Sequence, residues 1–144
     1  MKYRKTIEII SAILIMLFLY TGGQKVMEHD VFRIQLARQP LPDWLIPTLT
    51  WTLPPAELLA AGLLVFQKTR NSGLYMSLTL LSSFTLYTAM AYSEAFGYAP
   101  CACGRIFSSM GWGAHLLMNT ALLTLNSVAV YLSRIKPINA MNTS

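Results

Sequence analysis

Residues 7–23 read Ile-Glu-Ile-Ile-Ser-Ala-Ile-Leu-Ile-Met-Leu-Phe-Leu-Tyr-Thr-Gly-Gly, and this apolar run follows a basic stretch at residues 2–5. A helix that spans the hydrocarbon core needs about 20 residues. Tyr3 and Lys25 flank the run and extend it by anchoring at the membrane interface. A signal peptide shares the basic start and the apolar centre, but its apolar region is shorter. The run therefore predicts a first transmembrane helix.

The composition of the whole chain agrees with this prediction. Of 144 residues, 54% are hydrophobic and 12% are charged, against roughly 25% charged in an average soluble domain. A small globule has too much surface to hide so large an apolar fraction. The net charge of +5 is distributed over short loops and does not indicate a nucleic-acid partner. We expect one domain over residues 1–144, with the lipid bilayer as its solvent.

Three further apolar runs predict an all-α, polytopic four-helix bundle. The expected helices cover residues 5–24, 54–67, 73–94 and 112–134. Pro54 and Pro55 suit the first turn of the second helix, where a missing N–H costs little. The serine and threonine hydroxyls of the third helix are expected to bond to the backbone.

The segment between the first two helices has a composition of its own. Residues 24–39 mix charged and apolar side chains at helical spacing, which predicts a short amphipathic helix on the membrane surface. The proline-rich residues 40–53 are expected to lack a regular helix. Trp44 and Trp51 favour the headgroup level. This part is either an interfacial collar or a simple connecting loop.

The basic residues predict the orientation of the bundle. Four spans place seven of the chain's 11 lysines and arginines on one side of the membrane. The other four fall on the opposite side, among acidic residues. The positive-inside rule then places both termini in the cytoplasm of a bacterium, and residues 94–113 in the periplasm. The seven are Lys2, Arg4, Lys5, Lys68, Arg70, Arg134 and Lys136.

Both cysteines of the chain lie in Pro100-Cys101-Ala102-Cys103-Gly104, inside this external segment. Thiols on the oxidising side of the membrane tend towards disulfides or redox work. A ring closed between Cys101 and Cys103 is tight, and strain makes a disulfide easier to reduce. So short a loop removes little chain entropy. The pair is therefore a candidate for redox exchange rather than for stabilising the fold.

Two other interpretations of the cysteines remain open. A zinc site needs two further ligands, and His29 and His115 are the only histidines, so a metal is disfavoured. In the second interpretation, the cysteines are two inert thiols without a role in function.

Four polar residues inside predicted spans are further candidates for function. Glu57 is expected to face protein, water or the interface, because a carboxylate facing lipid is costly. His115 and Asn119 share a helix face, and Asn126 returns to that face. An imidazolium near the cysteines would stabilise a thiolate. A histidine hydrogen-bonded at a helix start is the alternative. The two asparagines are candidates for holding a cofactor.

Short motifs spread over most of the chain resemble the DoxX/MauE group of bacterial membrane proteins. They are Tyr20-Thr-Gly22-Gly23-Gln-Lys25, Phe32, Pro55-x-Glu57, Cys101-Ala102-Cys103-Gly104 and Trp112-Gly-Ala-His115 with Asn119. The resemblance implies a redox-associated inner-membrane protein, linked to disulfide formation in, or maturation of, a periplasmic partner enzyme. The four-helix plan is also similar to the quinone-linked DsbB and vitamin K epoxide reductase proteins. Those use a Cys-x-x-Cys pair and a second external pair, which this chain lacks.

Three hypotheses follow for the function. In the first, Cys101 and Cys103 exchange a disulfide with a periplasmic thioredoxin-like or client protein, as part of a thiol–disulfide oxidoreductase system. Glu57 and His115 then tune proton transfer, and a quinone stays open as a cofactor. In the second, the chain is a non-catalytic accessory or assembly subunit of a larger membrane complex. In the third, which rests on the polar stripe alone, it is a small-solute transporter or a quinone-binding protein.

Overall fold

The computed structural model describes residues 2–93 and 111–135, and within these ranges the chain forms five helices and no strand. Four of the helices are long and apolar enough to cross a membrane. This confirms the predicted all-α, four-helix membrane bundle. The helices are α1 (Lys2–Met27), α2 (His29–Ala37), α3 (Leu45–Val65), α4 (Arg70–Tyr92) and α6 (Trp112–Ile135).

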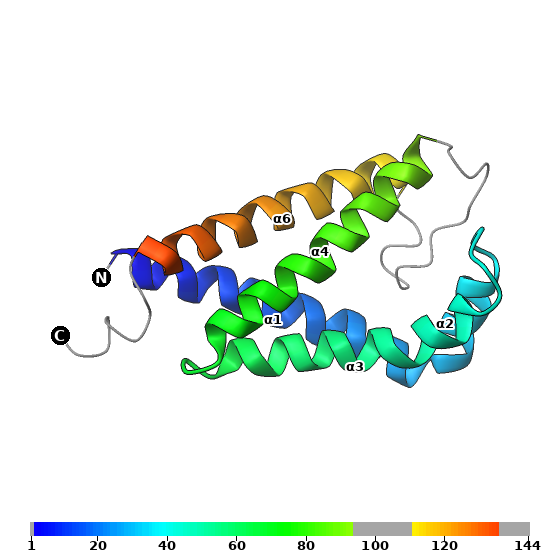
Figure 1. Ribbon diagram of the computed structural model, residues 1–144, viewed down its shortest axis with the longest axis horizontal. Coiled ribbons are helices and arrows are strands. Elements are labelled where there is room, and N and C mark those ends of the chain that lie inside the picture. The colour runs from blue at the N-terminus through cyan, green and yellow to red at the C-terminus, as the bar shows by residue number, and fades with distance from the viewer. Residues whose placement is uncertain (1, 94–110, 136–144) are drawn as a thin grey trace.

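The four long helices pack as two pairs. α1 lies along α3, α4 lies along α6, and the two pairs meet through α3 with α4 and α1 with α6. Figure 1 shows the short helix α2 at one end of the bundle, together with the last turns of α4. The start of α1 and the end of α6 lie at the other end. We call the end of the bundle at which α2 lies the α2 end.

The core is built from one apolar stripe on each long helix. Leu14 and Phe18 of α1, Leu64 of α3 and Leu81 of α4 are all fully buried, and Ala129 of α6 packs against them. Large apolar side chains on the opposite faces are exposed, as expected for a surface that contacts lipid. Because lipid is as apolar as leucine, the helices are held together by close packing and interhelical hydrogen bonds. Examples of these exposed side chains on the long helices are Met16, Leu86, Leu117 and Tyr131.

Gly73, near the start of α4, packs directly against the backbone of α3. A Cβ atom added there would lie 2.8 Å from the Leu64 backbone nitrogen and 3.0 Å from the Leu63 carbonyl carbon. Glycine is therefore required for α4 to pack directly on the α3 backbone. One turn later, the Ser77 hydroxyl donates a hydrogen bond to the Gly73 carbonyl oxygen at 2.7 Å. This is the local backbone bonding predicted for the hydroxyls of this helix.

The prediction that prolines would keep residues 45–53 from forming a helix is wrong. α3 begins at Leu45, not near residue 54, and Pro54 and Pro55 lie inside it. Pro47 falls in the first turn, where a backbone N–H has no acceptor within the helix. The interior prolines are tolerated because α3 is a membrane helix packed against neighbours, and such helices accept proline.

The segment after the first span also differs from the prediction in its boundaries. α1 continues to Met27, beyond the expected end near residue 24, and α2 spans His29–Ala37. α2 is amphipathic, as predicted for this segment. Phe32 and Leu36 are buried against the bundle, whereas Val31 and Ile34 are exposed. The longer α1 brings Lys25 into a helix, on the face of the bundle interior.

Candidate functional site

A cavity of about 300 Å³ lies inside the bundle toward its α2 end. Its walls come from all five described helices and from the segment after α2. Most lining side chains are leucine or aromatic, with a small number of polar groups among them, which is typical of a small-molecule site. The polar lining residues are Thr21, Lys25, Gln39, Glu57, Ser83, Tyr87, His115 and Asn119.

A buried ion pair forms one side of the cavity. The Lys25 ammonium donates to Oε1 of Glu57 at 2.5 Å, and their side chains are 9% and 0% exposed. Gly22, one turn before Lys25, lets α1 approach closely, because a Cβ there would lie 3.2 Å from the Cβ of Glu57. An isolated charge in this interior would cost several kcal/mol, so each residue needs the other.

Two aromatic rings extend the contacts of the ammonium group. Lys25 Nζ lies 5.5 Å from the centroid of the Phe32 ring and 5.7 Å from that of the Phe84 ring. Both distances are within the range of cation–π attraction. The ion pair therefore joins α1 to α3 and also touches α2 and α4.

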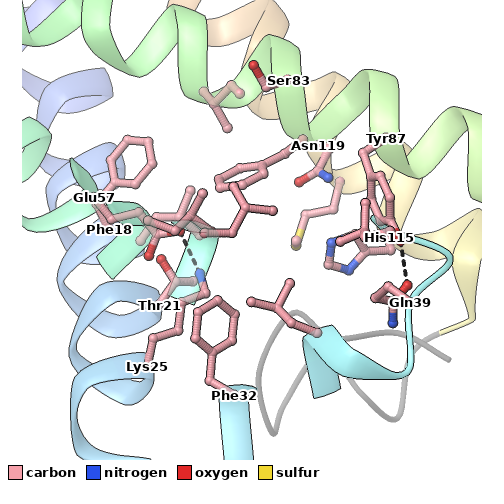
Figure 2. A pocket seen from close by; sticks show the side chains of 18 of the residues that line it. Phe18, Thr21, Lys25, Phe32, Gln39, Glu57, Ser83, Tyr87, His115 and Asn119 are labelled. Carbon is pink, nitrogen blue, oxygen red and sulfur yellow. Dashed lines mark hydrogen bonds and ion pairs between the residues drawn. The ribbon is translucent and has the colours of Figure 1, made fainter. Parts of the chain in front are cut away.

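A second polar group lies across the cavity from the ion pair, as Figure 2 shows. The Tyr87 hydroxyl donates a hydrogen bond to Oε1 of Gln39. Nδ2 of Asn119 donates to the Thr88 hydroxyl at 3.1 Å. The His115 ring is buried and lines the cavity beside them. These contacts connect α4 with α6 and with the segment that follows α2.

The end of α4 and the start of α6 meet beside this second polar group. The rings of Tyr87 and Trp112 form an edge-on contact with centroids 6.3 Å apart. A Cβ at Gly113 would lie 3.2 Å from the ring of Tyr92. The chain between these helices, residues 94–110, therefore leaves and re-enters the described structure at the α2 end. Cys101 and Cys103 belong to it and lie outside the described residues.

The structure brings three of the predicted candidates together and separates the fourth. Glu57, His115 and Asn119 all line the cavity. Asn126 does not, because its amide is fully buried elsewhere between α6 and α4 and donates to the Leu74 carbonyl oxygen at 3.3 Å. Its contact is one of helix packing.

Sequence reasoning did not single out five of the eight polar lining residues, among them Lys25, Gln39 and Tyr87. The sequence did contain a signal that could have identified Lys25. It follows Phe18 and Gly22 at helical spacing, so a helix that continued past Gly23 would place its ammonium on the buried face. Gln39 and Tyr87 had none, because their contact joins residues 48 apart in sequence.

Removing the amide of Asn119 is expected to loosen the contact between α4 and α6. For Asn119→Ala we expect a loss of about 0.6 kcal/mol in unfolding free energy, and at most about 1.7 kcal/mol, the range for interhelical hydrogen bonds in membranes. Thr120→Ala is the matched control, because that exposed hydroxyl bonds only to the Leu116 carbonyl oxygen of its own helix. Equilibrium unfolding of both variants in mixed micelles measures the difference. Equal losses of unfolding free energy in the two variants would contradict the assignment of the Asn119 amide to the contact between α4 and α6.

No group of three or more histidine, cysteine, aspartate or glutamate side chains that could hold a metal occurs in the described part of the chain. A family model described as "Methylamine utilisation protein MauE" matches residues 3–132. The match covers α2, α3 and α4 in full, α1 except for its first residue, and α6 except for its last three residues. No curated protein and no solved structure matches the chain.

Proposed function

The chain belongs to the MauE family of methylamine utilisation proteins, and from that premise we propose that it exchanges disulfides with a periplasmic partner. In this proposal the chain is a multi-pass protein of the bacterial inner membrane that contributes to the maturation of that partner. Cys101 and Cys103 are the reactive pair. The partner is a thioredoxin-like protein or a client enzyme with two thiols of its own.

One observation carries the proposal. The segment that holds both cysteines starts at the end of α4 and returns at the start of α6, where the Tyr87 and Trp112 rings meet. His115, on the first turn of α6, lies on the cavity wall at that place. A histidine that comes close to a cysteine can stabilise its thiolate and transfer a proton. We assign that role to His115, and in the proposal Glu57 is a further group for proton transfer in the same cavity.

The exchange needs no further oxidant. A thiolate of the partner attacks one sulfur of the Cys101–Cys103 disulfide, and a mixed disulfide forms while the other cysteine leaves as a thiolate. The second thiol of the partner, once deprotonated, then displaces the chain's cysteine. The partner ends with a disulfide, and Cys101 and Cys103 end as thiols after taking up the two protons. The reverse exchange passes through the same mixed disulfide.

The proposal needs the α2 end of the bundle to face the periplasm. The distribution of basic residues supports this orientation, because Arg4, Lys5, Lys68, Arg70 and Arg134 all fall at the opposite end. The exposed side chains of Trp44 and Trp51 at the start of α3 suit the headgroup level on the periplasmic side.

Trapping the mixed disulfide tests the proposal. With only one cysteine left in the chain, its thiolate can still attack the disulfide of the oxidised partner in the reverse exchange. The neighbouring cysteine that would release the partner is then missing, so Cys101→Ser or Cys103→Ser is expected to accumulate a reductant-sensitive adduct. Membranes are quenched with acid and alkylated, and their proteins are separated on non-reducing gels. The protein attached to the chain is then identified by mass spectrometry. The Cys101→Ser/Cys103→Ser double variant is the control without an adduct. Absence of an adduct from both single variants, with thiols that never change redox state, would refute the exchange. A partner that co-purifies equally with the double variant would instead favour an accessory subunit.

A further inference from the structure

We propose that the cavity binds a membrane-dissolved molecule with an apolar body and an acceptor oxygen, which the Lys25 ammonium binds. This inference does not depend on the cysteines, because all the residues that carry it lie in the five described helices. It assigns a ligand to a space that the disulfide exchange proposed above leaves unused. Three observations support it, namely the mouth of the cavity, the donors inside it and the lining of its walls.

We place the mouth of the cavity beside Ser83 of α4, in the side of the bundle. Among the described residues that line the cavity, Ser83 is the exposed one, and Leu49 and Leu53 of α3 are half-buried. Ser83 lies nine residues before Tyr92, so its depth is roughly 14 Å from the end of α4 at a rise of 1.5 Å per residue. The hydrocarbon core is about 30 Å thick. The mouth is therefore near the middle of the bilayer, where the solvent is lipid.

Within the described part of the chain, the Lys25 ammonium has fewer hydrogen-bond acceptors than it has N–H groups. A lysine ammonium carries three N–H groups, and Glu57 is its one hydrogen-bond acceptor among residues 2–93 and 111–135. The rest of the group faces the Phe32 and Phe84 rings and the cavity. A buried donor without an acceptor costs free energy. An oxygen of a bound molecule would remove that cost.

The walls around this group fit an apolar body rather than a polar solute. Leu17, Leu49, Leu53 and Met118 contribute half-buried apolar surface on three sides. The volume of about 300 Å³ is at the lower end of the range for small-molecule sites. Carbonyl oxygens on a ring and the carboxylate of a fatty acid both supply the required acceptor. The shared chemistry is one acceptor oxygen on a lipid-soluble body.

Photoaffinity labelling distinguishes these sources and reports where the ligand lies. The full-length protein in phosphatidylcholine nanodiscs is labelled with a photoreactive alkylbenzoquinone or with a diazirine-bearing dodecanoic acid. We expect one of the two probes to label cavity residues such as Leu49 and Met118, and unlabelled probe of the same class to compete. The Cys101→Ser/Cys103→Ser variant is expected to label equally, which separates this inference from disulfide exchange.

Variants at the mouth provide the decisive comparison. Ser83→Trp is expected to fill the mouth and to lower cavity labelling at least tenfold. Leu86→Trp is the matched control on the same helix, because Leu86 is exposed and lies outside the cavity lining. Met118→Trp fills the space from α6 and covers the case in which Ser83→Trp lowers the yield of folded protein. The Lys25→Met/Glu57→Met double variant, which removes both charges together, is expected to weaken binding about tenfold, as for one hydrogen bond to a charged group.

Two results would overturn the proposal. One is labelling by both probes only at lipid-facing positions such as Met16 and Leu117. The other is cavity labelling that is the same in Ser83→Trp, Met118→Trp and Leu86→Trp.

Discussion

Replacing Lys25 with methionine is expected to lower the free energy of unfolding by about 3–5 kcal/mol, the loss measured when one partner of a buried ion pair is removed. The reason is the environment of Glu57. Its side chain is 0% exposed, and Lys25 is the cation bonded to its carboxylate. Without the ammonium, the folded protein must hold a carboxylate inside an apolar wall or take up a proton there. Equilibrium unfolding in mixed micelles, followed by circular dichroism, measures the loss.

Two further variants isolate the interaction. Lys25→Met/Glu57→Met is expected to regain most of the lost stability, because apolar side chains of similar size often replace a buried pair without loss. Lys68→Met is the matched control, since Lys68 is exposed in the turn between α3 and α4, and we expect it to change stability by less than about 0.5 kcal/mol. A double variant that is less stable than Lys25→Met would contradict this account of the pair.

Adding a single methyl group at Gly73 is expected to be nearly as damaging. In Gly73→Ala, the new Cβ would lie 2.8 Å from the Leu64 backbone nitrogen, so α4 must move away from α3. Overpacking of this kind costs about 1–3 kcal/mol, and we expect the upper part of that range because the clash is with backbone that cannot rotate away.

Gly62→Ala provides the comparison for this prediction. A Cβ at Gly62 meets no atom within 4 Å, and the residue is exposed on α3. Alanine is a better helix former than glycine by about 0.5–1 kcal/mol, so no loss is expected. Thermal unfolding of the two alanine variants gives the comparison. Similar midpoints for both would show that the α3–α4 contact tolerates separation.

The spanning helices were predictable where the length of an apolar run determines them. The last one was expected at residues 112–134 and is found at Trp112–Ile135. The second was misplaced because proline carries a strong penalty in soluble helices, whereas a packed membrane helix accepts Pro54 and Pro55. The start of α3 depends on such tertiary contacts, and these are not local to the sequence.

The candidate site was predictable in part for a similar reason. A carboxylate or an imidazole inside an apolar run is conspicuous, and Glu57 and His115 were found in this way. Lys25 follows two glycines that suggest the end of a helix. In the folded protein Gly22 instead permits contact with Glu57, so α1 continues and carries Lys25 inward. The roles assigned to Cys101 and Cys103 stay predictions.

The ion pair between α1 and α3 also has a consequence for biosynthesis. Lys25 leaves the ribosome 32 residues before Glu57, so for that interval its ammonium has no carboxylate to bond. A membrane helix on its own keeps such a charge at the surface by extending the side chain toward water. We therefore expect α1 to reach its final position only after α3 has inserted. A nascent chain that stops before Glu57 exposes a lysine that has no carboxylate to neutralise it. The same contact that stabilises the mature bundle thus orders the steps by which it is assembled.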